Sequence, residues 1–137
     1  MADKQYPLPQ LHGVLVLDKP SGPTSTRCLT AIKRLGQKKI GHAGTLDPLA
    51  AGVLVVLLGE ATKIAPYVME GEKTYLGALR LGVATDTYDS EGTVTTEAPW
   101  DHVSASALAE AIASWTALTS QEVPPYSAAK HQGRPLY

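Results

Sequence analysis

Two short apolar runs constrain the fold of this chain more than any other feature. They read "GVLVLDKP" (13–20) and "GVLVVLLG" (52–59), and proline or glycine ends each of them. Runs of this length and composition are typical of buried strands, whereas a helix that crosses a bilayer needs about 20 apolar residues. We therefore expect two buried strands in a globular α/β or α+β domain with no membrane-spanning segment.

The remaining sequence alternates between helical and strand patterns. After the turn "SGPTS" (21–25), Thr24 or Ser25 can cap a helix that Gly36 ends. The residues of its apolar face are Cys28, Leu29, Ile32 and Leu35. A glycine-rich connection follows over 36–48, and "EATKIAPYVME" (60–70) has a helical pattern that Pro66 should interrupt.

The second half continues this alternation with weaker signals. "KTYLGALRLG" (73–82) predicts a third strand, with Tyr75 on one side of it, and 83–94 is rich in turn residues. "SASALAEAIASWTAL" (104–118) predicts an alanine-rich helix. The expected buried face of that helix consists of Leu108, Ile112, Trp115 and Leu118. The last segment, 122–137, combines turn signals with a short strand pattern.

Composition narrows the class of protein. With 137 residues and 44% apolar content, the chain is expected to form one globular domain with a core. Cys28 is the only cysteine, which excludes an internal disulfide and a cysteine-based zinc cluster. The N-terminal sequence "MADKQYPLPQ" lacks the basic and then apolar layout of a signal peptide. We therefore expect a cytoplasmic protein.

The charges are distributed unevenly. Residues 1–40 carry seven Lys or Arg and two Asp, whereas the rest of the chain carries five cations and eleven acids. Such asymmetry can mark a nucleic-acid-binding face beside an acidic rear surface. Charge alone favours the simpler alternative of a solvated helix face, and the absence of phenylalanine removes one source of base-stacking side chains.

The segment "GHAGTLDPLAAG" (41–52) places one carboxylate, Asp47, among small and apolar residues. Asp followed by Pro is a good turn or helix N-cap pair, and local chemistry alone favours that interpretation. A carboxylate held by backbone N–H groups stays ionised, so the same residue can be a nucleophile or a base on a fixed loop. The pattern permits catalysis without requiring it.

Other functional motifs fail on spacing. "GHAGT" lacks the Gly-Lys-Ser/Thr of a phosphate-binding loop, and the four histidines do not have metal-ligand spacing. "DTYDSEG" (86–92) resembles a calcium loop, but Asp86, Asp89 and Glu91 do not follow its alternate positions. A hydrophilic hairpin connection is the better interpretation. A glycosidase would need a second catalytic acid near Asp47, and spacing identifies none.

Four blocks together resemble the TruB family of tRNA pseudouridine synthases. They are "GVLVLDKPSGPTS" (13–25), "GHAGTLDPLAAGVLVVLLGEATK" (41–63), "KTYLGALRLGVATDTYDSEG" (73–92) and "PPYSAAKHQGRPLY" (124–137). The resemblance runs in order along nearly the whole chain and is closest to the bacterial stand-alone branch. It implies the pseudouridine synthase fold, with a mixed, largely antiparallel central sheet flanked by helices.

The resemblance also implies roles for individual residues. Asp47 matches the essential aspartate of the family and would be catalytic. His42 matches a histidine that lies against the target nucleotide, and Tyr75 matches a tyrosine that stacks on the uracil. Lys19, with Pro20, matches a pair expected to support the catalytic loop or contact substrate. Without the family, His42 would be a loop hydrogen-bonding residue, Tyr75 a core residue and Lys19 a surface cation.

The function implied is conversion of the uridine at position 55, in the T-loop of tRNA, to pseudouridine after base flipping. This isomerisation needs no cofactor and no metal. The expected partner is the T-arm of tRNA, and the full-length protein should be a monomer. Residues 1–12 would be an N-terminal tail and 13–137 the N-terminal portion of the catalytic domain, inactive alone. The alternatives are a catalytically silent RNA-binding module and a glycoside hydrolase.

Overall fold

The computed structural model describes residues 9–120, 130–131 and 134–135. The chain forms two compact units, Met1–Tyr75 and Leu76–Tyr137. Each unit is an α+β arrangement with antiparallel strands, which confirms the fold class. Most of the expected N-terminal tail and the sequence block at 124–129 lie outside the described residues.

The first unit is built around a three-stranded antiparallel sheet. Its order is β1 (Gly13–Lys19), β3 (Gly52–Leu58) and β2 (Ile40–Ala43), with β3 in the centre. Both predicted strands are confirmed. The prediction that 36–48 is only a glycine-rich connection was wrong in part, because β2 lies inside it. The four residues of β2 have no strand pattern of their own, and pairing with β3 makes them a strand.

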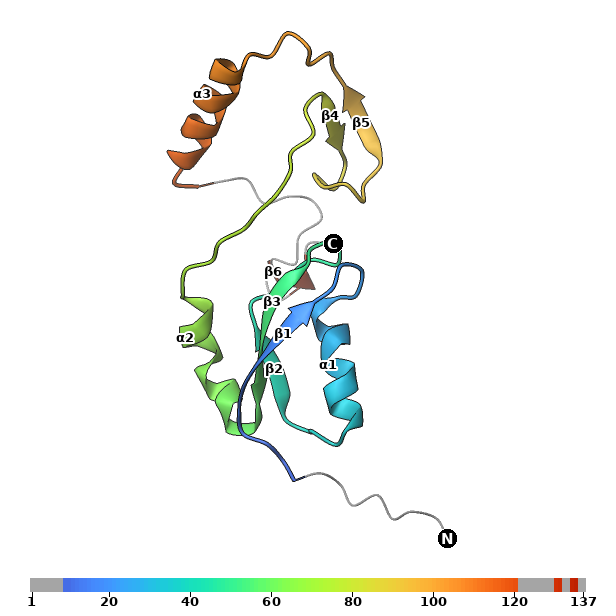
Figure 1. Cartoon of the computed structure of the whole chain (residues 1–137), viewed down its shortest axis with the longest axis vertical. Coiled ribbons are helices and arrows are strands. Elements are labelled where there is room, and N and C mark those ends of the chain that lie inside the picture. The colour runs from blue at the N-terminus through green and yellow to red at the C-terminus, as the bar shows by residue number, and fades with distance from the viewer. Residues whose placement is uncertain (1–8, 121–129, 132–133, 136–137) are drawn as a thin grey trace. The chain divides into compact units, whose positions relative to one another are not determined.

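The first helix, α1 (Ser25–Arg34), covers one face of this sheet (Figure 1). Thr24 is its N-cap, since the Thr24 hydroxyl accepts a hydrogen bond from Arg27 N at 3.1 Å. Leu29 packs against three leucine and valine side chains of β3: Leu54, Val56 and Leu58. The expected burial of Leu35 was wrong, because Leu35 is the C-cap and lies past the residues that pack on the sheet.

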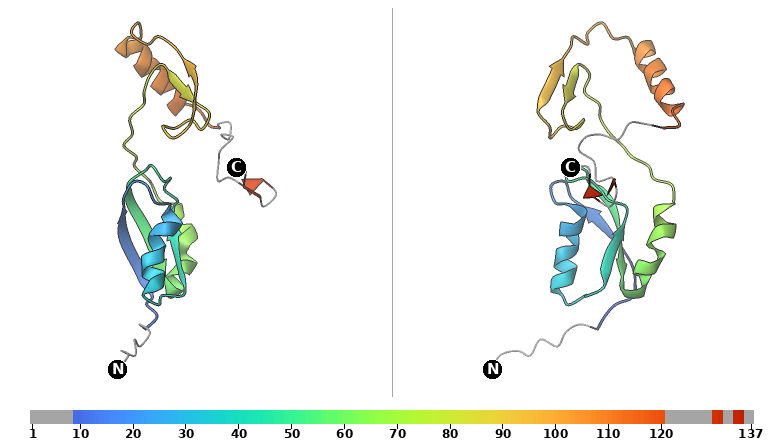
Figure 2. Two further views of the ribbon diagram at one scale, coloured as in Figure 1. Left: turned by 90° about the vertical axis from the view of Figure 1, so that its right-hand side faces the viewer. Right: turned by 180° about the vertical axis from the view of Figure 1, so that it is seen from behind.

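A short 3₁₀ helix, η1 (Gly59–Ile64), leads from β3 into the helix α2 (Ala65–Met69). Pro66 stands at the start of α2, which confirms the predicted interruption at this proline. Gly59 has φ +56°, and a Cβ there would lie 2.5 Å from Leu11 O, so only glycine fits without strain. α1 and α2 lie on opposite faces of the sheet, as the left view of Figure 2 shows with α1 in front.

One side of β1 and β3 is exposed in part, although we expected both strands to be buried; on the same side, Leu57 is fully buried. Val14, Val16 and Val53 alternate with the residues that face α1, and each is more than half exposed. α1 covers only the other face at this position. The sequence pattern correctly predicts apolar strands. It does not tell which face of each strand is covered, because that depends on tertiary packing.

The predicted third strand over 73–82 was wrong. Residues 72–80 have no helix or strand, and Tyr75, Leu76 and Leu79 are exposed. A strand needs a hydrogen-bonded neighbour, and none of the strands in the described part of the chain pairs with this segment.

The second unit contains a hairpin, a helix and a short strand pair. β4 (Val83–Thr85) pairs with β5 (Val94–Glu97), which confirms the hairpin connection, and β6 (Lys130–His131) pairs with β7 (Arg134–Pro135). α3 (Ala105–Thr116) is the predicted helix, capped by Ser104. Its expected buried face was wrong, since Ile112, Trp115 and Leu118 are about half or more exposed. None of the described helices is long and apolar enough to cross a membrane.

A candidate active site on the loop between β2 and β3

Asp47 begins a β-turn on the loop that joins β2 to β3. Ala50 N donates a hydrogen bond to Asp47 O at 3.1 Å, and Pro48 occupies the second position, which suits its fixed φ. The turn interpretation of the Asp-Pro pair is thereby confirmed, and the helix N-cap alternative was wrong because residues 48–51 do not form a helix. The expected backbone donors are also absent: no described residue donates a hydrogen bond to the exposed Asp47 carboxylate.

Lys19 lies beneath this turn. Its side chain is completely buried, and its Nζ donates to Pro20 O at 3.1 Å, Pro48 O at 3.2 Å and Ala50 O at 2.6 Å. Three carbonyls use all three N–H donors of an ammonium group. The surface-cation alternative for Lys19 was therefore wrong. A direct contact between Lys19 and substrate would require the ammonium to leave these carbonyls.

The N-terminal end of α1 holds the loop from the other side. The Ser25 hydroxyl donates to Leu46 O at 2.8 Å and accepts from Leu46 N at 2.9 Å. Gly22 N donates to Pro48 O at 2.7 Å. Sequence reasoning treated Ser25 only as an alternative cap and missed its contact with the loop. The available signal was a second hydroxyl directly after the cap residue Thr24.

His42 lies in β2, close to the start of the same loop. Its Nδ1 is 3.1 Å from Gly44 O, and the side chain is half-buried. Because a carbonyl oxygen only accepts, Nδ1 carries the proton in this contact, and in a neutral ring Nε2 is then a free acceptor. The loop hydrogen bond expected of His42 is observed, and it leaves the other ring nitrogen available.

Tyr75 lies in the irregular segment after α2. It is 72% exposed, so the alternative of a core residue was wrong. No hydrogen bond between described residues joins Tyr75 to Asp47 or His42. The structure therefore gathers Lys19 and Ser25 beneath the Asp47 turn and places His42 at the base of the loop, but it does not join Tyr75 to them.

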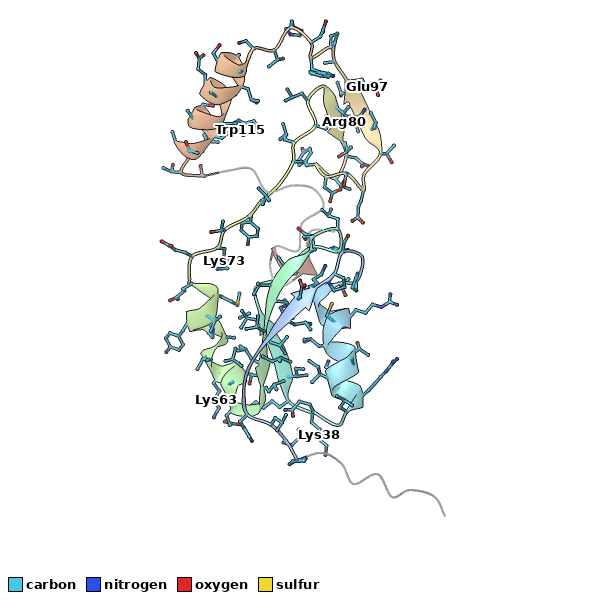
Figure 3. All side chains as sticks on the ribbon, viewed as in Figure 1. Lys38, Lys63, Lys73, Arg80, Glu97 and Trp115 are labelled. Atoms are coloured by element: carbon cyan, nitrogen blue, oxygen red, sulfur yellow. The ribbon has the colours of Figure 1, made fainter. Side chains whose placement is uncertain are left out.

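The outer surface of α1 and the residues that follow it is basic. Arg27, Lys33, Arg34 and Lys38 are exposed, and none forms an ion pair with an acidic group among the described residues. Lys38 is labelled in Figure 3. Lys39 and Lys63 instead both donate to Glu60, and these contacts lower the pKa of Glu60 to about 2. We call the four unpaired cations the α1 basic surface.

The acidic loop between β4 and β5 is held by its own hydrogen bonds. Thr87 Oγ1 and Glu91 N donate to Asp89 Oδ1 at 2.6 and 2.9 Å, and these contacts lower the pKa of Asp89. Asp86 accepts from Thr93 N at 2.8 Å. Both carboxylates thus stabilise the turn, and no cluster of three or more metal-ligating side chains occurs among the described residues.

Removing the Lys19 ammonium should destabilise the loop strongly. Lys19→Met keeps a similar apolar stem but leaves Pro20 O, Pro48 O and Ala50 O without this donor. Pro48 O still accepts from Gly22 N, but Pro20 O and Ala50 O lose this bond. A buried group that loses its partner costs about 1–3 kcal/mol, so we expect the free energy of unfolding to fall by about 2–4 kcal/mol. Urea titration followed by circular dichroism measures this change. The control Lys33→Met removes an exposed cation, and equal unfolding midpoints for the two variants would contradict the buried role.

Comparison with known proteins identifies relatives over the whole chain. Residues 33–137 match the model of the TruB family pseudouridylate synthase N-terminal domain. A tRNA pseudouridine synthase B of Nitratidesulfovibrio vulgaris strain Hildenborough is 65% identical over 129 residues, which cover 93% of this chain and 42% of the relative. The protein of the same name from Oleidesulfovibrio alaskensis is 60% identical over 138 residues, covering 100% of this chain and 44% of the relative. This chain thus spans less than half the length of those relatives, and it belongs to the TruB family of pseudouridylate synthases.

Proposed function

We propose that this chain is the N-terminal part of the catalytic domain of an enzyme that converts the uridine at position 55 of tRNA to pseudouridine. The observation that carries the proposal is the state of Asp47. Its carboxylate is exposed and accepts no hydrogen bond from described residues, while Lys19 and Ser25 hold the loop beneath it. The relatives named tRNA pseudouridine synthase B support tRNA as the substrate.

The chemistry suits a single carboxylate. The N1–C1′ bond of uridine breaks, the uracil turns, C5 bonds to C1′, and the proton that leaves C5 is balanced by one gained at N1. All other atoms are retained, and no electron is gained or lost. Asp47 would act as a nucleophile on the sugar or the base, or as a base toward the ribose. A carboxylate that accepts no hydrogen bond from the described residues, on a turn held by hydrogen bonds, is available for any of these steps.

The target uridine must leave its stack before Asp47 reaches it. Enzymes that act on a base inside folded nucleic acid extrude it, at a cost of a few kcal/mol. The exposed ring of Tyr75 offers a stacking surface, and stacking of a base on an aromatic side chain returns about 1–3 kcal/mol. In this proposal His42 contacts the extruded nucleotide through its free Nε2.

The α1 basic surface would bind the phosphates of the T-arm. Cations without acidic partners among the described residues are available for phosphate contacts, which position an RNA without reading its sequence. The same surface also supports the second candidate function, an RNA-binding module without catalysis. Turnover at a defined uridine separates the two functions.

The test uses an enzyme that carries these residues at the length of the relatives, which we call the full-length enzyme. tRNA labelled with tritium at C5 of uridine is incubated with this enzyme, and the release of tritium is measured. A matched transcript carries cytidine at position 55. Release from the uridine transcript alone is the expected result. Tight binding without tritium release would support the RNA-binding module. Equal release from both transcripts would contradict position 55 as the site of the reaction.

Substitutions at Tyr75 should separate stacking from hydroxyl chemistry. Tyr75→Phe keeps the ring, so the full-length enzyme should retain tRNA affinity while any step that uses the hydroxyl slows. Tyr75→Leu also removes the stacking surface, and we expect tRNA binding to weaken by about 1–3 kcal/mol. Filter binding and single-turnover rates measure both effects. Wild-type binding and rates in both variants would show that Tyr75 does not contact the uracil.

A further inference from the structure

The Ser25 hydroxyl forms two hydrogen bonds with one residue of the loop, Leu46. The side chain is 2% exposed, and its hydroxyl both donates to Leu46 O and accepts from Leu46 N. Leu46 directly precedes Asp47. A buried hydroxyl with both functions satisfied by one backbone residue imitates the pairing of a neighbouring strand, and it fixes that residue from two sides.

These contacts set the direction of the Asp47 side chain. Leu46 O belongs to the peptide group before the Asp47 Cα, and Asp47 O, which accepts from Ala50 N, belongs to the peptide group after it. Because the two adjoining peptide planes determine φ and ψ of Asp47, holding both planes fixes the Cα–Cβ bond. Lys19 contacts Pro48 O and Ala50 O, so among the described side chains Ser25 is the one that holds the preceding plane.

The Ser25 hydroxyl does not serve α1. Thr24 already caps this helix through its contact with Arg27 N, and both hydrogen bonds of the Ser25 hydroxyl lead to Leu46. The two adjacent hydroxyls therefore have different roles. Thr24 stabilises the helix, and Ser25 joins the helix to the loop. This division provides a matched pair of variants.

We propose that Ser25 is a positioning residue for catalysis, which holds the Asp47 carboxylate in the orientation that reacts with the target nucleotide. The inference rests on the proposed function, because it assigns Ser25 a role through Asp47. It differs from a purely structural role in what it predicts. Loss of the hydroxyl should lower kcat, whereas tRNA binding, which uses the exposed cations and Tyr75, should change little.

The experiment compares four variants of the full-length enzyme on labelled tRNA. Ser25→Ala removes both contacts with Leu46, and a small misplacement of a reacting group costs up to about 100-fold, so we expect kcat to fall by about 10- to 100-fold with KM within about twofold. Ser25→Thr keeps the hydroxyl and should restore most of kcat. Thr24→Ala removes a cap of α1 without touching the loop, and it should lower the unfolding midpoint while kcat stays at the wild-type level. Asp47→Asn reports on the proposed function itself.

The outcomes separate the two hypotheses. A kcat of Ser25→Ala within twofold of wild type, or equal kcat losses in Ser25→Ala and Thr24→Ala, would overturn the positioning role. If Ser25→Ala does not fold, Ser25→Cys replaces it, because a thiol is a weaker donor and should give an intermediate kcat; wild-type kcat there would also overturn the inference. An active Asp47→Asn enzyme would refute the proposed function, whereas an inactive Asp47→Asn enzyme beside a normal Ser25→Ala enzyme would refute only the role of Ser25.

Discussion

Asp47→Asn in the full-length enzyme should abolish pseudouridine formation and leave the protein folded. The substitution keeps the size of the side chain, and Asn is as suitable as Asp at the first position of a β-turn. No described residue donates to the carboxylate, so no hydrogen bond within the described structure is lost. The negative charge and one carboxylate oxygen disappear, so the substituted side chain could be neither the nucleophile nor the base of the proposed mechanism. Loss of a nucleophile lowers kcat by about 10⁴-fold or more in well-studied enzymes, and we expect a loss of that order.

Three measurements decide this prediction. Tritium release from C5-labelled tRNA reports turnover, filter binding reports affinity for tRNA, and urea titration reports stability. The matched control is Asp101→Asn. Asp101 is a highly exposed aspartate of the second unit, whereas Asp47 lies in the first. Both variants should bind tRNA and resist urea as the wild type does. Only the control should also turn over tRNA at the wild-type rate. A folded Asp47→Asn enzyme that turns over tRNA at a near-normal rate would remove Asp47 from the mechanism.

The sequence correctly predicted the strands and the helix that are determined by their own residues. β1 and β3 are dense runs of valine and leucine, and α1 has a cap, an apolar stripe and a final glycine, so each was correctly predicted. β2 was missed because its backbone pairs with β3 and its own residues carry no strand pattern. The strand predicted around Tyr75 failed for the converse reason. Its alternation is present, but no described strand pairs with it.

The sequence offered candidate site residues, but it did not show how the loop that carries them is held. Local chemistry around Asp47 predicted a turn and only permitted catalysis, and the resemblance named Asp47, His42, Tyr75 and Lys19 as site residues. That Lys19 is buried under three carbonyls is not visible in a sequence, because a lysine after a strand is usually a surface residue. Ser25 was hidden in the same way. Its partner Leu46 is 21 positions away, and only the packing of α1 beside the loop brings the two residues together.

Residues 1–137 alone should show no measurable synthase activity, although they contain Asp47. The relatives named tRNA pseudouridine synthase B are more than twice as long, and catalytic groups must be held within about 0.5 Å of their productive positions. The described structure leaves Val14, Val16 and Val53 exposed on one face of the sheet, and it leaves Tyr75 without a hydrogen bond to Asp47 or His42. We therefore expect the geometry that the reaction requires to be incomplete in this segment.

RNA binding by the isolated segment should survive in a weak form. Phosphate contacts by the α1 basic surface need no complete active site, and their strength falls steeply as the salt concentration rises. The exposed apolar face should also make the segment associate with itself, which sedimentation velocity would detect.

The test of synthase activity compares the purified segment with the full-length enzyme in the tritium release assay at equal concentrations. Release by the segment at a comparable rate would mean that residues 1–137 already hold Asp47, His42 and Tyr75 in productive positions, so that no structure beyond them is needed for catalysis.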